Sequence, residues 1–309
     1  MSEKTARFNA RSWGLEVNRR EALQMVDSER PILICGPTAS GKSSLALDIA
    51  THRGGQIING DALQVFSDWR ILTARPSDTD LKAARHKLYG HVAGHERYSV
   101  GAWLRDVAKH LDGERPIIVG GTGLYFTALC YGLADIPPVP PEIRAEADRK
   151  VAEQGFETLL EQLDPDTAQN IDRQNPVRVQ RAWEVLQATG EGLALWQSRT
   201  GPPLLDLKAC QPFVMHAPPD WLNPRIAARF QQMLDQGLMD EARQNQPNWR
   251  ANLPSAKAIG ATELMEHLAG KLSQHDLATR VDTLTRQYAK RQRSWFRNRM
   301  KSWNWIQPD

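Results

Sequence analysis

The stretch ILICGPTASGKSSLALDIA, residues 32–50, decides the fold of this chain. An apolar run ends at Gly36, the motif G-x-x-x-x-G-K-[ST] occupies residues 36–43, and apolar residues at helical spacing follow. A strand, a glycine-rich loop and a helix in this order predict the opening of a parallel α/β sheet. In such a loop backbone amides converge on phosphate oxygens, Lys42 reaches a terminal phosphate and Ser43 can hold magnesium. We therefore expect the loop to bind a di- or triphosphate, and the motif leaves open which one.

Two further strands are predicted, at residues 56–59 and 117–119. A helix capped by Ser99 precedes the second of them, and the spacing favours parallel strands joined by crossover helices. The run IPPVPP, residues 136–141, holds four prolines, which remove backbone donors and keep the chain extended. We predict a domain hinge there.

The chain is expected to divide into four parts. Residues 1–29 lack the apolar stretch of a secretory signal and do not resemble a packed element, so a mobile N-terminal extension is predicted. Residues 30–138 form the first part of the phosphate-loop core, and residues 139–205 form a mostly helical insertion domain. Residues 206–309 return to the core, with a strand from Pro212, a helix capped by Asn223 and a basic C-terminal helix.

Composition excludes several classes of protein. The 309 residues include three widely separated cysteines, which argues against a disulfide scaffold and a zinc finger. The longest uncharged stretch, residues 116–134, is interrupted by glycines, so a membrane-spanning helix is not expected and a cytoplasmic location is.

The net charge of +3 does not establish nucleic-acid binding, but its distribution is uneven. Residues 279–301 hold eight basic residues against one acid, interleaved with aromatic residues. This segment predicts a basic helix that either contacts nucleic acid or presents a solvated face. Trp295 and Phe296 within it are expected to pack rather than to stack on RNA.

Asp61 is the acid expected at the carboxyl edge of the sheet beside the phosphate loop, where open α/β folds bind ligands. Its position is consistent with a magnesium ligand, a general base or a turn former. No apolar strand clearly ends in the aspartate that ATP-hydrolysing proteins use for magnesium. A small-molecule kinase using ATP and a non-enzymatic RNA-binding protein switched by nucleotide remain alternatives at this point.

Eight stretches, in this order from about residue 31 to 300, together resemble one family. They are GPTASGKS from Gly36, GDALQVF from Gly60, ILTARP from Ile71, GGTGLY from Gly120, PVRVQRAWEV from Pro176, PRIAARFQQMLDQGL from Pro224, AKAIG from Ala256 and TRQYAKRQRSWFR from Thr285. The chain resembles the tRNA dimethylallyltransferases (tRNA isopentenyltransferases), of the bacterial type without a zinc finger. The resemblance implies an α/β, P-loop NTPase-like parallel sheet flanked by helices.

The resemblance also implies a reaction. A dimethylallyl group passes from dimethylallyl diphosphate to the exocyclic N6 amine of the adenosine 3′-adjacent to the anticodon, in tRNAs reading codons that begin with U. Asp61 would be the general base, Gln64 would recognise the flipped base, and Thr38 and Arg225 would line the reaction channel. The diphosphate would be held by Gly36, Pro37, Thr38, Ala39, Ser40, Gly41, Lys42 and Ser43, the last also binding Mg²⁺ as the cofactor.

The partner implied is the anticodon stem-loop of tRNA, bound by a monomer. The matching positions are Asp61, Ala62, Leu63, Gln64, Thr122, Arg144, Val177, Arg178, Val179, Gln180, Arg181 and Lys257. Departures from the family pattern occur at Phe66, Arg75, Val177 and Ala261.

Overall fold

The computed structural model describes residues 14–308, which form a seven-stranded sheet in which every strand pair is parallel. The strand order is β1-β7-β6-β2-β5-β3-β4. The strands are β1 (Glu16–Val17), β2 (Ile32–Cys35), β3 (Gln56–Asn59), β4 (His86–Lys87), β5 (Pro116–Gly120), β6 (Gln211–Met215) and β7 (Asn304–Ile306). The α/β prediction and its strands at residues 32–35, 56–59 and 117–119 are confirmed.

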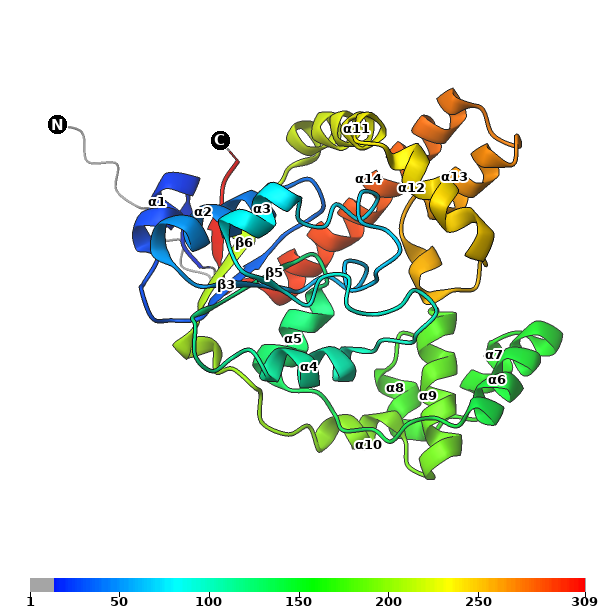
Figure 1. Ribbon diagram of the computed structural model, residues 1–309. Helices are drawn as coiled ribbons and strands as arrows, with labels where there is room; N and C mark the ends of the chain where they lie inside the picture. The colour runs from blue at the N-terminus through cyan, green and yellow to red at the C-terminus, as the bar shows by residue number, and fades with distance from the viewer. Residues whose placement is uncertain (1–13, 309) are drawn as a thin grey trace. The chain divides into compact units, whose positions relative to one another are not determined.

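Helices connect and cover these strands (Figure 1). They are α1 (Arg19–Met25), α2 (Lys42–Arg53), α3 (Asp78–Ala83), α4 (Val100–Ala108), α5 (Gly123–Tyr131), α6 (Pro141–Gln154), α7 (Glu157–Leu160), α8 (Pro165–Asn170), α9 (Pro176–Thr189), α10 (Leu193–Ser198), α11 (Pro219–Asp235), α12 (Leu238–Asn245), α13 (Ala261–Leu268) and α14 (Gln274–Arg299). Short 3-10 turns occur at η1 (Leu207–Ala209), η2 (Gln246–Asn248) and η3 (Pro254–Lys257).

The central strand β2 explains why the sheet is buried on both faces. Ile32 and Ile34 point to one face, where α1 and α2 pack, and Leu33 and Cys35 point to the other, where α4, α5 and α14 pack. All four side chains are fully buried. A continuous apolar run is what a parallel strand covered on both faces requires, because successive side chains alternate between the faces.

The N-terminal prediction is wrong for residues 14–29. β1 pairs with β7, and α1 begins at a capping box formed by Asn18 and Glu21. Val17 and Ala22 are buried in the core beside α2. The local pattern does not predict this strand, because β1 is two residues long and its partner strand lies at the far end of the chain. The expected extension at residues 1–13 lies outside the described residues.

The helix α11 begins earlier than predicted. Its first residue is Pro219 rather than Pro224, and Pro218 rather than Asn223 is the N-cap. Pro219 is tolerated at the first helical position because its missing N–H has no partner there in any helix. Pro224 therefore lies inside the helix.

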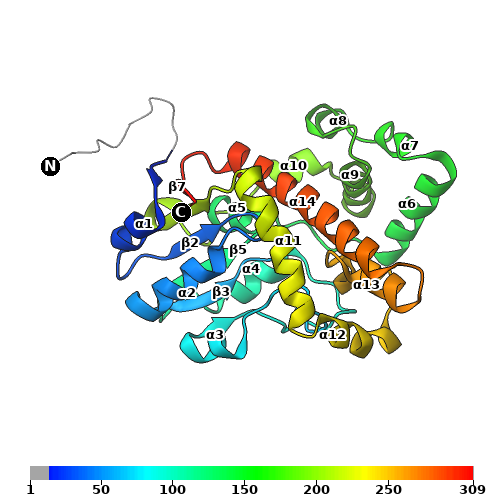
Figure 2. The ribbon, with the colours of Figure 1, turned by 90° about the horizontal axis from the view of Figure 1, so that it is seen from above.

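The helix α14 carries the predicted basic segment, and it runs beside α11 in both views (Figures 1 and 2). Its Phe296 side chain is buried.

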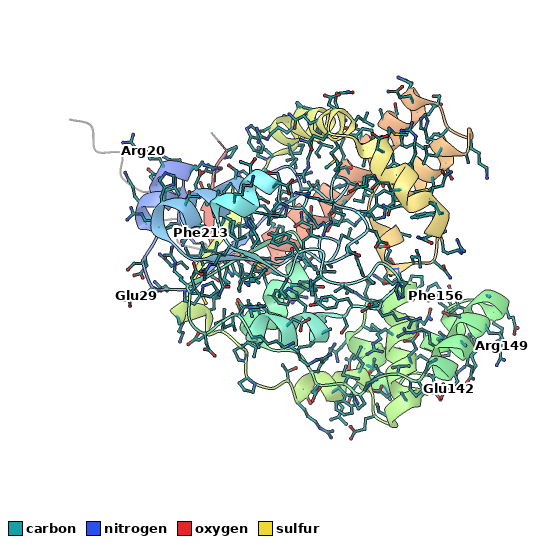
Figure 3. All side chains as sticks on the ribbon, viewed as in Figure 1. Arg20, Glu29, Glu142, Arg149, Phe156 and Phe213 are labelled. Carbon is teal, nitrogen blue, oxygen red and sulfur yellow. The ribbon has the colours of Figure 1, made fainter. Side chains whose placement is uncertain are left out.

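The contacts within the chain divide it into two compact units, and Tyr131–Leu204 is the second of them. The prediction set the boundaries of this region at residues 139 and 205. The unit holds α6 to α10, and its own core includes Ala147, Leu159 and Trp183. Glu142 and Arg149 project outward from α6 (Figure 3).

A membrane-spanning helix would need a long and strongly apolar segment. Within residues 14–308 no helix has both the length and the hydropathy to cross a bilayer.

Candidate active site

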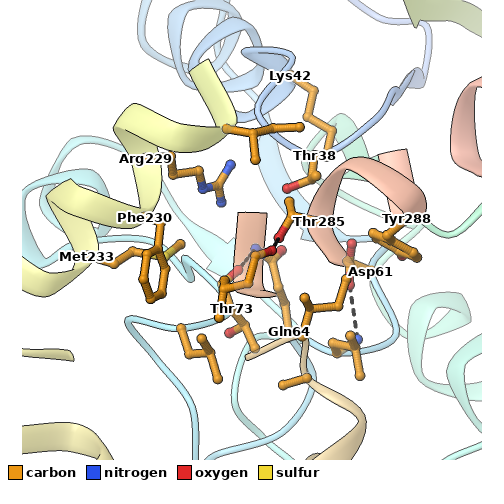
Figure 4. Close-up of a pocket in the computed structure, with 16 residues that line it drawn as sticks. Thr38, Lys42, Asp61, Gln64, Thr73, Arg229, Phe230, Met233, Thr285 and Tyr288 are labelled. Atoms are coloured by element: carbon orange, nitrogen blue, oxygen red, sulfur yellow. Dashed lines mark hydrogen bonds between the residues drawn. The ribbon is translucent and has the colours of Figure 1, made fainter. Parts of the chain in front are cut away.

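The first unit contains a cavity that reaches the phosphate loop. Its walls come from the loop, the segment after β3, and the helices α11 and α14 (Figure 4). The described residues that line it are Thr38, Lys42, Asp61, Leu63, Gln64, Leu72, Thr73, Ile226, Arg229, Phe230, Met233, Ala258, Ile259, Val281, Thr285 and Tyr288. Charged groups and apolar side chains thus share one space, which suits a ligand with a charged end and a hydrocarbon end.

The phosphate loop follows β2 and leads into α2, as its motif predicts. Ala39 adopts a left-handed backbone conformation with φ of 61°, and the Ser40 amide donates to the Pro37 carbonyl at 3.3 Å. The Lys42 ammonium donates to the same carbonyl at 3.2 Å, so its side chain folds back over the loop. The loop ends at the amino terminus of a twelve-residue helix, a position that favours anions.

Two cations reach this cavity. Burial lowers the pKa of Lys42 from its ordinary value to about 8, the charge of Asp61 opposes this shift, and the nearby Arg229 adds to it. Burial also lowers the pKa of the Arg229 guanidinium, again opposed by Asp61. No salt bridge joins either cation to a carboxylate within the described part of the chain. An anionic ligand would relieve the repulsion between Lys42 and Arg229.

Asp61 is held by backbone groups on both of its carboxylate oxygens. Oδ1 accepts from the Leu63 amide at 3.0 Å, which forms a local turn, and Oδ2 accepts from the Gly121 amide at 3.3 Å. Asp61 is the one carboxylate among the described residues that line the cavity. Burial and the negative charge of Asp61 raise the pKa of Tyr288, which therefore stays a neutral phenol. Asp61 is thus placed to accept a proton in this cavity.

Two chain segments must approach each other closely for this arrangement. A Cβ added to Gly120 would lie 2.0 Å from the Gly60 carbonyl oxygen and 2.7 Å from the Asp61 amide nitrogen. Only glycine permits this contact, because the opposing atoms belong to the backbone. Gly120 therefore brings the end of β5 against the segment that carries Asp61.

The side-chain amide nitrogen of Gln64 already donates two hydrogen bonds within the protein. Nε2 donates to the Thr73 carbonyl at 2.8 Å and to the Ala74 carbonyl at 2.9 Å. The side-chain oxygen remains available to accept a hydrogen bond from a ligand. Thr122, predicted to contact tRNA, also forms a hydrogen bond within the protein. Its hydroxyl accepts from the Ala62 amide at 2.9 Å.

Arg225, expected to line the reaction channel, is not among the residues that line this cavity. Its side chain is exposed, Nε donates to the Ala39 carbonyl at 3.2 Å, and its guanidinium lies over the Trp221 ring at 4.4 Å. Arg229, one turn farther along α11, enters the cavity instead (Figure 4). The sequence contained both arginines, but only the packing of α11 determines which of them faces the phosphate loop.

The predicted tRNA positions in the second unit differ in their surroundings. Arg144 and Arg181 both pair with the buried Glu184, at 3.5 and 3.8 Å. Arg178 is exposed, as is Val177 at 77 %. The side chain of Val179 is fully buried, because it lies on the inner face of α9.

The remaining predicted positions lie near the surface or in hydrogen bonds. Gln180 donates to Asp148 at 2.6 Å and to Glu184 at 3.1 Å. Lys257 is exposed, and Ala62 is partly buried against the core. Leu63 lines the cavity.

Ser43 was predicted to hold magnesium. Its side chain is exposed in the second residue of α2, and it lines a neighbouring depression together with Lys42. No group of three His, Cys, Asp or Glu side chains that could hold a metal occurs in residues 14–308. The exposed Ser43 hydroxyl could supply one oxygen ligand to Mg²⁺, an ion that is commonly bound by few protein oxygens together with ligand phosphate oxygens and water.

Three residues of this region were not singled out from the sequence. They are Asn59, Arg229 and Gln292. Asn59 is the last residue of the predicted strand at residues 56–59, and no motif marks it. Gln292 is the last residue of the TRQYAKRQ stretch, which belongs to the family resemblance but indicates no role for this glutamine.

A phosphate loop, two cations and a carboxylate around one partly apolar cavity, in a parallel α/β sheet, are features of a P-loop protein that binds a phosphorylated ligand. The chain matches the family described as IPP transferase over residues 64–299, and the one described as Isopentenyl transferase over residues 30–90. It therefore belongs to the tRNA dimethylallyltransferase (IPP transferase) family.

Curated relatives and solved structures agree. The chain is 55% identical to the tRNA dimethylallyltransferase of Dinoroseobacter shibae over 289 residues, which cover 93% of this chain and 97% of the relative. It is 54% identical to that of Paracoccus denitrificans, with 93% and 98% covered. A eukaryotic dimethylallyltransferase captured acting on tRNA matches with a TM-score of 0.75 and 25% identity, over 90% of this chain and 74% of that one. The tRNA isopentenylpyrophosphate transferase of Bacillus halodurans matches with a TM-score of 0.62 and 29% identity, over 90% of both chains.

Proposed function

We propose that this chain transfers a dimethylallyl group from dimethylallyl diphosphate to the exocyclic N6 amine of the adenosine 3′-adjacent to the anticodon, in tRNAs that read codons beginning with U. Its relatives are tRNA dimethylallyltransferases. The observation that carries the proposal is the cavity in which the Asp61 carboxylate and the Lys42 ammonium of the phosphate loop both line one space.

The reaction joins the adenine nitrogen to the first carbon of the dimethylallyl group. The bond between that carbon and the bridging oxygen breaks, and the diphosphate leaves with the electron pair. The N6 proton passes to Asp61. An amine conjugated to a purine is a poor nucleophile, and general-base assistance is typically worth about 10²- to 10⁴-fold in rate.

The leaving diphosphate gains negative charge as the bond breaks. Lys42 and Arg229, which both line the cavity, stabilise this charge as it develops. Phe230 and Met233 on α11 supply apolar surface for the hydrocarbon end of the donor. Arg225 acts from outside the cavity, through its bond to the Ala39 carbonyl.

Gln64 assists recognition of the base. Its Nε2 already donates to two backbone carbonyls, so its free oxygen can only accept. An adenine presents an N6–H donor to such an oxygen, whereas a guanine presents a carbonyl at the equivalent position. The base must leave its stack to enter, at a cost of a few kcal/mol that is smaller in a loop than in a duplex.

Mg²⁺ is the proposed cofactor, held by the Ser43 hydroxyl and by diphosphate oxygens. When bound, the ion neutralises charge on the leaving group. The Ser43 side chain is exposed, so its hydroxyl is available for this role.

The tRNA is proposed to contact the predicted positions in both units, with Arg178 offering the most exposed of the arginines on α9. We place the protein in the cytoplasm as a monomer. The division into a core and a helical unit is proposed to separate chemistry from tRNA clamping.

One experiment tests the proposal. Unmodified tRNA is incubated with dimethylallyl diphosphate labelled in its hydrocarbon part, with the wild type and with Asp61→Ala. Label retained on adenosine with the wild type and lost with the variant supports it, provided that tRNA affinity is nearly unchanged. Phosphate transfer from ATP without prenyl incorporation would instead identify a small-molecule kinase.

A further inference from the structure

Gln292 lies on α14 between the phosphate loop and the turn that follows β5. Its side chain is 5% exposed and forms hydrogen bonds at both ends. Oε1 accepts from the Thr38 amide at 2.9 Å, and Nε2 donates to the Gly121 carbonyl at 2.9 Å. One buried amide thus joins two loops that belong to different strands of the sheet.

The orientation of this amide is determined by its partners. Thr38 offers only a backbone N–H to Gln292, and Gly121 offers only a carbonyl. A flipped amide would oppose two donors at one end and two acceptors at the other, which is costly in a buried site. The bridge therefore has a single arrangement.

Each end of the bridge leads to a group of the proposed reaction. Thr38 lines the cavity and precedes Ala39, whose left-handed backbone shapes the phosphate loop. The Gly121 amide donates to Asp61 Oδ2 at 3.3 Å. The connected path therefore runs from the loop through Gln292 and Gly121 to the carboxylate.

The turn after β5 accommodates α14 at two glycines. A Cβ added to Gly121 would lie 2.3 Å from Gln292 Nε2 and 3.0 Å from Asp61 Oδ2. A Cβ added to Gly123 would lie 2.1 Å from Trp295 Nε1. Gln292 and Trp295 are three residues apart and share a helix face, so α14 covers the turn at two successive points.

We infer that Gln292 is a positioning residue that holds the phosphate loop and the Asp61 carboxylate in one fixed relation. The inference rests on the proposed function, because the phosphate loop would hold the dimethylallyl diphosphate and Asp61 would act on the adenine amine that displaces the diphosphate. Such a displacement is sensitive to separation, and a misplacement of about 1 Å can lower the rate about 100-fold.

The first test replaces Gln292 with an apolar side chain of similar length. Gln292→Met removes both bonds, and we expect kcat to fall about 10- to 100-fold while KM for both substrates stays within about threefold. The matched control is Gln274→Met, an exposed glutamine at the start of the same helix, which should retain wild-type kcat. An unchanged kcat in folded Gln292→Met, or a loss confined to KM, would overturn the inference.

The second test uses pH and does not depend on how well the first variant folds. In Gln292→Glu the protonated carboxyl can still accept from Thr38 and donate to Gly121, whereas the ionised form faces the Gly121 carbonyl with a second acceptor. Burial at this position, together with the negative charge of Asp61 on the adjacent Gly121 amide, raises the pKa of the introduced carboxyl.

We therefore expect the ratio of the kcat of Gln292→Glu to that of the wild type to fall as pH rises. A ratio that stays constant with pH would contradict the bridge. A wild type that transfers no dimethylallyl group would refute the proposed function itself. An active wild type with variants of equal kcat would refute only the role of Gln292.

Discussion

Asn59 holds the backbone of Asp61 with both ends of its side-chain amide. Its Oδ1 accepts from the Asp61 amide at 2.8 Å, and its Nδ2 donates to the Asp61 carbonyl at 2.9 Å. Nδ2 also donates to the Leu88 carbonyl at 3.0 Å, and Asn59 is fully buried. The last residue of β3 thus positions the backbone of the proposed base, while Leu63 and Gly121 position its carboxylate.

Asn59→Ala should destabilise the fold and impair turnover. The change leaves the Asp61 amide and the Leu88 carbonyl without their partner, so we expect the free energy of unfolding to fall by about 2 kcal/mol or more. Denaturant unfolding followed by circular dichroism measures this difference. The control is Asn298→Ala, at an exposed residue of α14, which should change stability by less than about 0.5 kcal/mol. Equal stability of the two variants would show that the bonds of Asn59 are dispensable.

Arg229 should contribute more to catalysis than Arg225. Arg229 enters the cavity, where the proposed reaction would develop charge on the diphosphate, so Arg229→Met should lower kcat about 10²- to 10³-fold. Arg225→Met removes an exposed side chain that bonds to the Ala39 carbonyl, and its loss should be clearly smaller. Steady-state kinetics with both substrates compare the two. The reverse order would restore Arg225 to the position expected from the family resemblance.

Diphosphate binding should weaken in alkaline solution. The pKa of Lys42 is lowered to about 8, so the free protein loses this positive charge as pH rises through that value. Because the ligand is an anion, its affinity should be steady just below pH 8 and fall above it, by at most about tenfold for each pH unit. Titration calorimetry with inorganic pyrophosphate measures the change.

The comparison for this pH effect is Lys42→Arg, because a guanidinium keeps its charge throughout the alkaline range. Its affinity for pyrophosphate should depend much less on pH. A wild type and a variant with the same alkaline slope would assign the effect to another group.

Gly120→Ala should be among the most disruptive single changes in the core. The added methyl would lie 2.0 Å from the Gly60 carbonyl oxygen, and neither backbone segment can give way without moving Asp61. We expect a loss of about 3 kcal/mol or more in the free energy of unfolding, together with lost turnover. Gly201→Ala serves as the control, since nothing lies within 4 Å of its added Cβ. Thermal unfolding compares the two variants, and equal midpoints would contradict the prediction for Gly120→Ala.

Arg178→Ala should weaken tRNA binding mainly at low salt. An exposed arginine that contacts a phosphate releases a counterion, so its removal should reduce the slope of log affinity against log salt by about 0.7 to 0.9. Filter binding at several salt concentrations measures the slope. Arg149→Ala, an exposed arginine of α6, should leave it unchanged (Figure 3). An unaltered slope in Arg178→Ala would remove this residue from the proposed interface.

Local patterns predicted the elements that hold the chemistry. The apolar run of β2 and the motif after it are contiguous, so strand, loop and helix could be inferred together with Lys42 and Ser43. The short strand β3, followed directly by Asp61, likewise placed the proposed base at the edge of the sheet. These elements can be predicted without the tertiary structure, because their patterns depend only on residues that are close together in the sequence.

Features that depend on distant partners could not be predicted in this way. The strand β1 pairs with β7, so residues 14–29 looked unstructured until their partner was known. The choice between Arg225 and Arg229 depends on the rotation of α11 against the core, which a helical pattern does not specify.

The amino-acid sequence by itself determined the fold class, the phosphate-binding loop and the acid beside it. These features depend on the spacing of apolar residues and on a loop motif, and both involve only residues that are close together in the sequence. The tertiary structure alone decided which arginine of α11 faces the cavity and which groups hold the Asp61 carboxylate in place. Gln292 makes its two bonds to residues 254 and 171 positions away, and only the packing of α14 against the sheet brings those atoms within hydrogen-bond distance.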